Sequence, residues 1–354
     1  MTAKLQRIIV SRTDAIGDVV LTLPLVGLLR RELGCEVIFL GKRYTQPVVA
    51  CCPDVARFVD WENLCRTGSL DASEEEAAPS KPVSSRQVAE ALRQLEADAI
   101  IHVLPNRAVA RAARRAKIPI RIGTSHRIFH WPTCNRVVRL SRRRSNLHEA
   151  QLNLLLADPL LGDRCRLSLD EVRALMHFVP PVASPAMRHL LDPGRFNLVL
   201  HPKSNGSARE WPLNHYLRMV DDLPLEKFKI FVCGTADEGK QAAPLAMSSD
   251  VVNLCGQFSL EEYIAFLGIV DGIVACSTGP LHLTAAAGRH AVGLYTSRRP
   301  MHSGRWAPLG PHVHIFDSKR VCPGCDEPKN CLCMADIDSA DVASALCSLP
   351  KLDN

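Results

Sequence analysis

The sequence predicts an α/β protein of two domains, each built on a parallel sheet. Three segments share the order apolar strand, polar glycine-containing loop, helix: residues 8–24, 197–212 and 274–288. Ligands of open α/β sheets bind outside the carboxyl ends of the strands. Because the three polar loops are spread over both halves of a 354-residue chain, we expect two facing domains with a cleft between them.

The composition is that of a globular protein with an ample core, with 47% hydrophobic and 23% charged residues. The net charge of +6 suits an anionic substrate or membrane surface and does not imply nucleic acid. No apolar run reaches the length of a transmembrane helix, and the first residues lead into a strand without a signal-peptide pattern. We therefore expect a cytoplasmic protein whose 14 cysteines are mostly buried and reduced.

Alternating strands and helices follow in order through the first half of the chain. Apolar runs predict strands at residues 7–12, 35–40, 55–61, 99–104 and 121–123, and helical spacing predicts helices at 19–33, 44–52, 87–95, 107–117 and 148–156. Pro24 would kink the first helix, and Gly34 stands at the position of a C-capping glycine. Residues 68–85 are acidic and small, which predicts an exposed loop. Residues 136–144 are basic and suit a solvated face, an anionic acceptor or a lipid head group.

The second half repeats this alternation. Prolines near residues 178–185 mark the expected boundary between domains of residues 1–180 and 190–354. Strands are expected at residues 196–200, 229–233, 251–254, 272–276 and 290–295, with helices at 213–223, after 238, at 259–267, after 279 and at 339–346. Pro212 suits the first turn of its helix, and Ser259 with Glu262 predicts a capping box.

The segment 274–288, VACSTGPLHLTAAAG, carries the strongest signal for a ligand. Backbone N–H groups and the helix dipole at the start of such a helix favour an anion. Thr278 would add a hydroxyl, Gly279 would let a ligand approach the backbone, and His282 lies about one turn into the helix. An ordinary strand-to-helix turn with a hydrogen-bonded histidine has the same pattern.

Asp18 follows Gly17 where the first helix is expected to begin. A carboxylate in the first turn is favourable against the helix dipole. A carboxylate at the cleft could instead act as a general base and take the proton of an acceptor hydroxyl. Both interpretations remain open from the residues alone.

The loop of residues 203–210 and Glu238 offer groups for a nucleotide. Arg209 could pair with a diphosphate and stabilise a leaving group, while Ser204, Asn205 and Ser207 add hydrogen-bond donors. Glu238 follows a glycine at a strand end, where a carboxylate could accept hydrogen bonds from ribose hydroxyls. The alternatives are a surface arginine and a first-turn helix carboxylate.

Other functional patterns are absent from the sequence or incomplete. It contains no GxxxxGK[ST], GxGxxG, HExxH or GxSxG motif. The tail at residues 322–333 places Cys322, Cys325, Cys331 and Cys333 close together. This spacing suits a zinc site, although the closing pair is cramped, and free thiols or a redox-labile cluster are equal alternatives.

Taken together, these residues resemble glycosyltransferase family 9, the ADP-heptose:lipopolysaccharide heptosyltransferases. The start RIIVSRTDAIGDVVLTLP and the segments HPKSNGSAREWP, CGTADEGKQ and STGPLHLTAAAG are similar to four family motifs in the family's order. The resemblance implies a GT-B fold of two Rossmann-like domains, with the donor nucleotide in the C-terminal one. It also implies an inverting transfer that requires no metal or cofactor.

The resemblance assigns roles to individual residues. Asp18 matches the catalytic base, and Arg12 with Gly17 falls at the acceptor. The donor-binding positions are Ser204, Asn205, Arg209, Glu238, Ser277, Thr278, Gly279 and His282. Two of these depart from the family pattern: many members have aspartate where this chain has Ser277, and lysine where it has Arg209.

The leading hypothesis is a heptosyltransferase-like enzyme of lipopolysaccharide biosynthesis. It would transfer heptose or a related sugar from ADP-heptose to an anionic glycolipid, such as a lipopolysaccharide core, with peripheral contact at the inner face of the cytoplasmic membrane. A nucleotide-sugar epimerase on the same fold would convert donor without an acceptor. A non-catalytic nucleotide-sugar-binding protein would bind donor without turnover.

Overall fold

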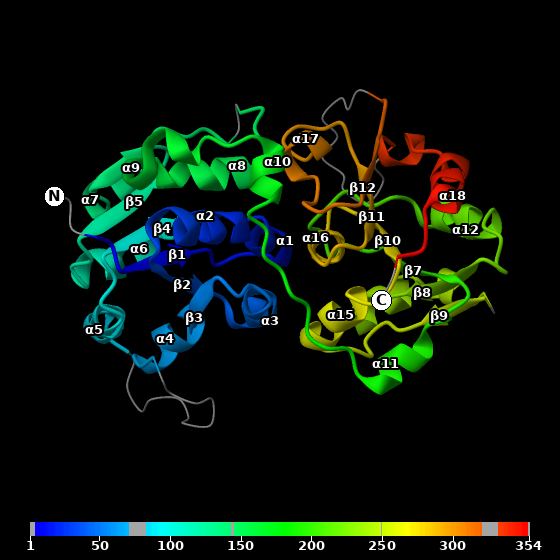
Figure 1. Ribbon diagram of the computed structural model, residues 1–354, viewed down its shortest axis with the longest axis horizontal. Coiled ribbons are helices and arrows are strands. Elements are labelled where there is room, and N and C mark those ends of the chain that lie inside the picture. The colour runs from blue at the N-terminus through cyan, green and yellow to red at the C-terminus, as the bar shows by residue number, and fades with distance from the viewer. Residues whose placement is uncertain (1–3, 71–82, 143–144, 249, 321–331, 353–354) are drawn as a thin grey trace. The chain divides into compact units, whose positions relative to one another are not determined.

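The computed structural model describes residues 4–70, 83–142, 145–248, 250–320 and 332–352 (Figure 1). It divides the chain into two compact units, Met1–Phe178 and Val179–Asn354. The division falls beside the proline-containing segment at residues 178–185. Much of the predicted acidic loop, residues 71–82, lies outside the described residues.

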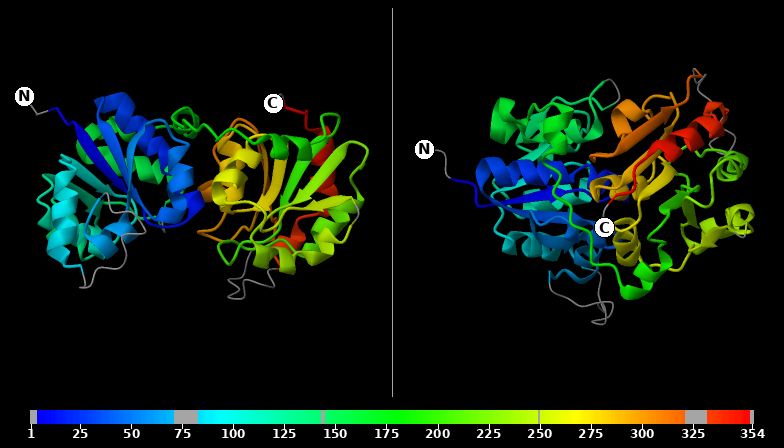
Figure 2. Two further views of the ribbon diagram at one scale, coloured as in Figure 1. Left: turned by 90° about the horizontal axis from the view of Figure 1, so that it is seen from below. Right: turned by 45° about the vertical axis from the view of Figure 1, so that its right-hand side comes forward.

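The N-terminal unit is built on a six-stranded parallel sheet in the order β3-β2-β1-β4-β5-β6. This is the strand order of the Rossmann fold, and helices cover both faces of the sheet (Figures 1 and 2). The strands are β1 (Arg7–Ser11), β2 (Glu36–Gly41), β3 (Val55–Asp60), β4 (Ala99–His102), β5 (Ile120–Thr124) and β6 (Arg136–Val138). The α-helices are α1 (Ile16–Val20), α2 (Leu23–Leu33), α3 (Gln46–Ala50), α4 (Trp61–Thr67), α5 (Ser85–Gln94), α6 (Arg107–Arg115), α7 (His130–Thr133), α8 (Glu149–Leu154), α9 (Asp158–Leu161) and α10 (Leu169–Arg173), with 3-10 turns at Arg43–Thr45, Leu155–Ala157 and Gly162–Cys165.

The C-terminal unit repeats the same topology, with the sheet order β12-β11-β10-β7-β8-β9. Its strands are β7 (Phe196–His201), β8 (Phe228–Val232), β9 (Val251–Asn253), β10 (Gly272–Cys276), β11 (His290–Tyr295) and β12 (Val313–Asp317). Its helices are α11 (Pro185–Leu190), α12 (Leu213–Asp221), α13 (Ala236–Gln241), α14 (Ala243–Ala246), α15 (Leu260–Leu267), α16 (Gly279–Ala286), α17 (Ser303–Trp306) and α18 (Ser339–Ser348), with a 3-10 turn at Met334–Asp336. The predicted α/β class with two parallel sheets is therefore confirmed.

Apolar strands of the two sheets explain why both faces must be covered. Every residue of β7, β10 and β11 is buried, as is typical of central parallel strands between two helix layers. In the N-terminal unit, α5 and α6 pack Leu92 and Val109 against Ile9 and Ile100 of the sheet. The arginines of α6 lie on its exposed side.

The helix predicted over residues 19–33 is two helices. Pro24 has no N–H to donate to the carbonyl of Val20, and its ring would clash with that carbonyl in a continuous helix. The chain therefore ends α1 at Val20 and restarts α2 at Leu23, with Pro24 in its first turn. Gly34 caps α2 with a left-handed φ of 61°, as the sequence predicts.

Other local expectations have mixed outcomes. The capping box of Ser259 and Glu262 is present, whereas Pro212 is the N-cap of α12 instead of lying within its first turn. The edge strands β6 and β12 were not predicted from the sequence, and neither were the short helices α4, α7, α9, α10, α11, α14 and α17. Within the described parts of the chain, no helix has both the length and the apolar character that a bilayer span requires.

Candidate functional site

In the N-terminal unit, the candidate residues lie where the strand order reverses. Arg12 follows β1 directly, and its backbone N–H donates to the Leu40 carbonyl at 3.0 Å. Gly17 and Asp18 lie in the first turn of α1, whose N-cap is Ala15. The strands β1 and β4 are neighbours from which the chain winds outward in opposite directions, and this is where open α/β sheets bind ligands.

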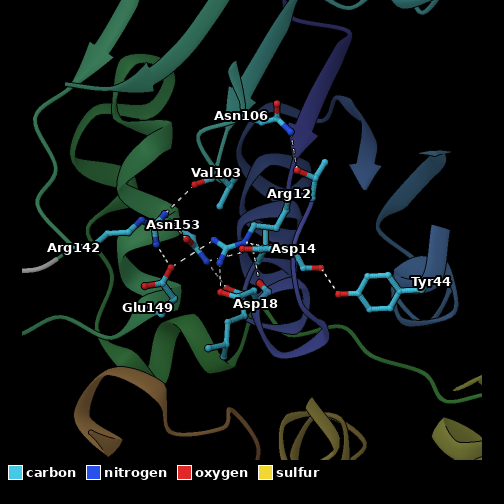
Figure 3. A network of polar contacts seen from close by, with 12 residues as sticks. Arg12, Asp14, Asp18, Tyr44, Val103, Asn106, Arg142, Glu149 and Asn153 are labelled. Atoms are coloured by element: carbon cyan, nitrogen blue, oxygen red, sulfur yellow. Dashed lines mark hydrogen bonds and ion pairs between the residues drawn. The ribbon is translucent and has the colours of Figure 1, made fainter. Parts of the chain in front are cut away.

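The Arg12 guanidinium is buried among three carboxylates (Figure 3). Its Nε lies 2.7 Å from Asp14 Oδ1, and its Nη1 lies 3.5 Å from Glu149 Oε1. Its Nη2 pairs with Asp18 Oδ1. The Arg12 side chain is 4% exposed, whereas those of Asp14 and Asp18 are 26% and 21% exposed. The two aspartates therefore form the solvent-facing part of the network.

A second guanidinium reaches the same network from Arg142 (Figure 3). Its Nη1 pairs with Glu149 Oε1, and its Nη2 donates to the Val103 carbonyl at 3.2 Å and to Asn153 Oδ1 at 3.0 Å. Asn153 in turn donates to the Leu21 carbonyl at 2.9 Å, at the break between α1 and α2. Arg142 and α8 thus fix the position of the segment that carries Asp18.

The network holds one more negative than positive charge when all five side chains are ionised. Burial raises the pKa of Asp14, the Arg12 guanidinium opposes that rise, and the Asp18 carboxylate adds to it. The Tyr44 hydroxyl donates to the backbone carbonyl of Asp14 at 2.6 Å, at the edge of the network. Two carboxylates held beside a fixed cation, one of them with a raised pKa, can accept a proton from a hydroxyl.

In the C-terminal unit, the candidate loops begin side by side at the carboxyl edge of the sheet. His201 of β7 lies opposite Ala275 of β10, so the loops that follow these strands start together. The Trp211 backbone N–H donates to Cys276 Sγ at 3.2 Å and ties the end of the first loop to the end of β10. The structure therefore brings residues 204–209 to the same edge as residues 277–279.

Glu210 organises the loop after β7. It accepts hydrogen bonds from the Ser204 backbone and hydroxyl, both at 2.9 Å, and pairs with Lys203 at 3.0 Å. Asn205 and Gly206 then turn the chain with φ values of 46° and 81°, a backbone that asparagine and glycine adopt most readily. Arg209 lies at the end of this loop and is 9% exposed.

Thr278 is the N-cap residue of α16, and Gly279 begins the helix. The Thr278 hydroxyl is buried and makes no hydrogen bond to any described residue. It can therefore serve a ligand at the start of the helix. Ser277 is partly exposed beside it, and His282 is buried one turn into α16.

Glu238 lies in the first turn of α13 and forms a capping box with Thr235. The Thr235 backbone N–H donates to Glu238 Oε2 at 2.8 Å, and the Glu238 N–H donates to the Thr235 hydroxyl at 3.2 Å. His201 lies nearby, where burial lowers its pKa and the Glu238 charge opposes that effect. The first-turn interpretation of Glu238 is thus what the structure shows, and its contact with a ribose stays a prediction.

Sequence reasoning missed the partners that hold the candidate residues. Asp14 and Tyr44 of the N-terminal network were not singled out, and Arg142 and Glu149 lay in a basic cluster and a helix with nothing to indicate that they meet. Glu210 directly precedes the Trp211-Pro212 pair. Its acidic charge beside Arg209 was the available signal for an organising role.

No two cysteines of the described chain form a disulfide with each other. Burial raises the pKa of Cys52 and Cys134 to about 11, so these thiols are poor nucleophiles. Cys333 is buried in the core of the C-terminal unit, whereas Cys322, Cys325 and Cys331 lie outside the described residues. No metal-binding group of three or more His, Cys, Asp or Glu side chains occurs among the described residues, and the zinc hypothesis for the tail stays a prediction.

Comparison with known proteins places the chain in a family. The sequence model of glycosyltransferase family 9 (heptosyltransferase) matches residues 85–332, which is more than half of the chain. The chain therefore belongs to this family and is a glycosyltransferase. Its two units, each with a six-stranded parallel sheet, are those of the GT-B architecture.

Individual relatives are distant. Lipooligosaccharide heptosyltransferase 2 of Haemophilus influenzae is 27% identical over 104 residues, which cover 28% of this chain and 30% of that protein. The structure of E. coli ADP-heptose lipopolysaccharide heptosyltransferase II has a TM-score of 0.71 at 18% identity, covering 97% of this chain and 98% of that one. E. coli heptosyltransferase WaaC with ADP has a TM-score of 0.65 at 17% identity, covering 96% and 99%. At such identities the structural likeness shows the shared fold.

Proposed function

We propose that this chain is an inverting glycosyltransferase that transfers heptose, or a related sugar, from ADP-heptose to a lipopolysaccharide core or another surface glycan. The observation that carries the proposal is the family 9 match, which spans the loops after β7, β8 and β10. The carboxylate–guanidinium network after β1 supports it, because glycosyl transfer to a hydroxyl needs a proton acceptor.

In the proposed reaction, Asp18 takes the proton of the acceptor hydroxyl as that oxygen attacks the anomeric carbon. The new glycosidic C–O bond forms on the face opposite the donor phosphate, and the bond to the diphosphate oxygen breaks. Asp18 is held by Arg12 through one carboxylate oxygen, Oδ1. Among the described residues its other oxygen, Oδ2, accepts no hydrogen bond and can receive the proton.

The departing ADP needs compensation for the charge that develops on its diphosphate. We assign this to Arg209, the Thr278 hydroxyl and the N-terminus of α16, because a guanidinium and helix N–H groups stabilise a phosphate leaving group. Ser204, Asn205, Ser277, Gly279 and His282 complete the proposed donor site, and Glu238 accepts from the ribose hydroxyls. These groups provide the charge stabilisation without requiring a metal or other cofactor.

The acceptor side is assigned to the N-terminal unit. Arg12 and Gly17 place the Asp18 carboxylate, and the acceptor is an anionic glycolipid that the enzyme meets at the inner face of the cytoplasmic membrane. The net charge of +6 supports an anionic partner of this kind.

Calorimetric titration of ADP against UDP, GDP and CDP tests the donor assignment. The informative variant is Glu238→Gln, because glutamine keeps an oxygen for the Thr235 N–H and so preserves the capping box while it removes the charge. Selective ADP binding that weakens in this variant supports the proposal. Preference for another nucleotide would discard heptose, and absence of binding to all four would contradict the donor site itself. Donor binding without transfer or hydrolysis would point to a non-catalytic nucleotide-sugar-binding protein, and conversion of the donor without any acceptor would point to an epimerase.

A further inference from the structure

One stretch of the N-terminal unit concentrates positive charge. Residues 99–148 contain 12 lysines and arginines and no aspartate or glutamate, in a chain whose total net charge is +6. The stretch covers β4, α6, β5, α7 and β6. Arginines on the exposed side of α6, in the loop before α7 and on β6 form no ion pair with any described carboxylate. Their charge is therefore open to an external partner.

Large apolar side chains are exposed in the same stretch. Ile128 is 88% exposed, Trp131 is 69% exposed and Val137 is 40% exposed. Trp131 is held in this position, because its Nε1 donates to the Ser125 carbonyl at 3.2 Å and its backbone N–H donates to the Ile128 carbonyl at 3.2 Å. Exposed apolar side chains that gather in one region mark an interaction site.

The elements that carry these side chains are neighbours. The short helix α7 packs on α6 and on β5, and β5 pairs with the edge strand β6. The Ser125 N–H, at the end of β5, donates to the Val138 carbonyl at 3.0 Å. We name this surface the α7 face and define it by two cations and three apolar side chains: Arg111, Arg127, Ile128, Trp131 and Val137.

We propose that the α7 face docks the N-terminal unit on the surface of an anionic phospholipid bilayer. Arginines attract the head groups of an anionic leaflet. Tryptophan and aliphatic tips enter the boundary between head groups and acyl chains, where an indole keeps its N–H satisfied. The proposal supplies the contact surface for a glycolipid acceptor, so it rests on the proposed function for its purpose.

Two other occupants suit this face less well. A second copy of the chain would bring two faces of the same charge together, which costs free energy. A nucleic acid would pair with the arginines and stack on Trp131, but it offers nothing to the aliphatic side chains of Ile128 and Val137. The mixture of cations and aliphatic tips is therefore best matched by a lipid surface.

Vesicle co-sedimentation of the full chain tests the proposal. We expect binding to vesicles that contain phosphatidylglycerol, weak binding to phosphatidylcholine alone, and loss of binding as salt rises to about 0.5 M. Each of Arg111→Gln and Arg127→Gln should weaken binding about fivefold, and Trp131→Ala with Ile128→Ala should weaken it about tenfold or more. Met247→Ala with Arg188→Gln is the matched control, since both residues are exposed in the C-terminal unit and this variant should bind as the wild type does.

Tryptophan fluorescence reports whether Trp131 enters the bilayer. Trp131 is far more exposed than Trp61 or Trp211, which are 7% and 1% exposed. Brominated acyl chains should therefore quench the wild-type emission and quench the Trp131→Ala protein much less. Equal binding to neutral vesicles, or no difference between the α7-face variants and the control, would overturn the proposal.

The remaining outcomes identify the rival occupants. Binding to RNA that depends on Arg127 while vesicle binding does not, or a dimer that Trp131→Ala dissociates, would also overturn the proposal. Sugar transfer to a detergent-dispersed acceptor and ADP binding are measured on the same proteins. If these persist while vesicle binding is absent, the docking inference fails and the proposed function stands. If vesicle binding persists while transfer and ADP binding are both absent, the docking inference stands and the proposed function fails.

Discussion

The guanidinium of Arg12 pairs with the Asp18 carboxylate across the first strand-to-helix connection of the N-terminal unit. The pair fixes one carboxylate oxygen of Asp18. The same guanidinium holds Asp14 at 2.7 Å, so two carboxylates compete for the role of proton acceptor. Which of them acts is a question that isosteric variants can answer.

Asp18→Asn should lower the rate of sugar transfer by about 10²- to 10⁴-fold, the range expected for loss of a general base. Asp14→Asn should have a smaller effect, because its carboxylate mainly orients Arg12. The measurement is single-turnover transfer to a lipopolysaccharide-core acceptor with purified variants. ADP binding should be unchanged in both, since the proposed donor loops belong to the C-terminal unit. A larger loss in Asp14→Asn than in Asp18→Asn would move the base assignment to Asp14.

Glu149 is the buried centre of the same network, with a side chain that is 1% exposed between Arg12 and Arg142. Glu149→Gln keeps its shape and removes its charge, which leaves the buried Arg12 guanidinium and the partly buried Arg142 guanidinium with less compensation. We expect the free energy of unfolding to fall by about 3 kcal/mol, measured by urea denaturation at neutral pH.

The matched control for Glu149 is Glu36→Gln. Glu36 pairs with Arg7 at 2.9 Å, but the side chains are 56% and 38% exposed. An exposed pair contributes at most about 1 kcal/mol. If the two variants lost the same stability, burial would not be what makes Glu149 important.

Local patterns in the sequence predicted the fold well, for physical reasons that act over short distances. Apolar runs at β1, β7 and β10 and polar loops at their carboxyl ends report burial and turn chemistry directly. Gly34 predicted a helix end because its left-handed φ suits a residue without Cβ. Pro24 predicted a distortion, but whether a helix bends or breaks depends on packing that the pattern does not contain.

The candidate site was predicted only in part, because its charges are neutralised over long sequence separations. Arg12 meets Glu149 across 137 positions, and no local spacing indicates that contact. Glu238 shows the converse case. Its local role in a capping box is readable from Thr235 three positions earlier, whereas a role at a ribose depends on a ligand. The role of Glu238 at a ribose was assigned because its segment is similar to a family motif, since local geometry alone does not indicate it.

A buried histidine makes the stability of the N-terminal unit sensitive to acid. His102 is fully buried at the end of β4, and burial lowers its pKa to about 3. In the unfolded chain the pKa returns to about 6.5, so the unfolded state binds more protons between these values and stability falls as pH falls. His102 alone would remove at most about 4 to 5 kcal/mol by pH 3.

His102→Phe should make unfolding less sensitive to pH between about 6.5 and 4, in urea denaturation series at several pH values. Its stability at pH 7 should change little, because neither ring nitrogen of His102 bonds to a described residue. His126→Phe is the exposed control and should keep the wild-type slope. An unchanged slope in His102→Phe would mean that other groups cause the acid sensitivity.

Variants at two threonines, Thr278 at the N-cap of α16 and Thr284 within that helix, distinguish an effect on ligand binding from an effect on folding. The Thr278 hydroxyl is buried and has no partner among the described residues, whereas the buried Thr284 hydroxyl donates to the Pro280 carbonyl at 2.9 Å. Thr278→Val should leave the free energy of unfolding unchanged or raise it, because it removes no hydrogen bond within the described chain. It should weaken ADP binding about tenfold through loss of a hydrogen bond to a charged phosphate.

Thr284→Val should show the opposite pattern. It loses an internal hydrogen bond, so unfolding should become easier by about 1 kcal/mol, while ADP binding stays as in the wild type. Calorimetric titration with ADP gives the affinity of each variant, and urea denaturation gives its free energy of unfolding. If Thr278→Val bound ADP normally, the phosphate would not lie at the start of α16. The donor site would then have to rest on the loop that carries Arg209, and Arg209→Gln would be expected to abolish binding by itself.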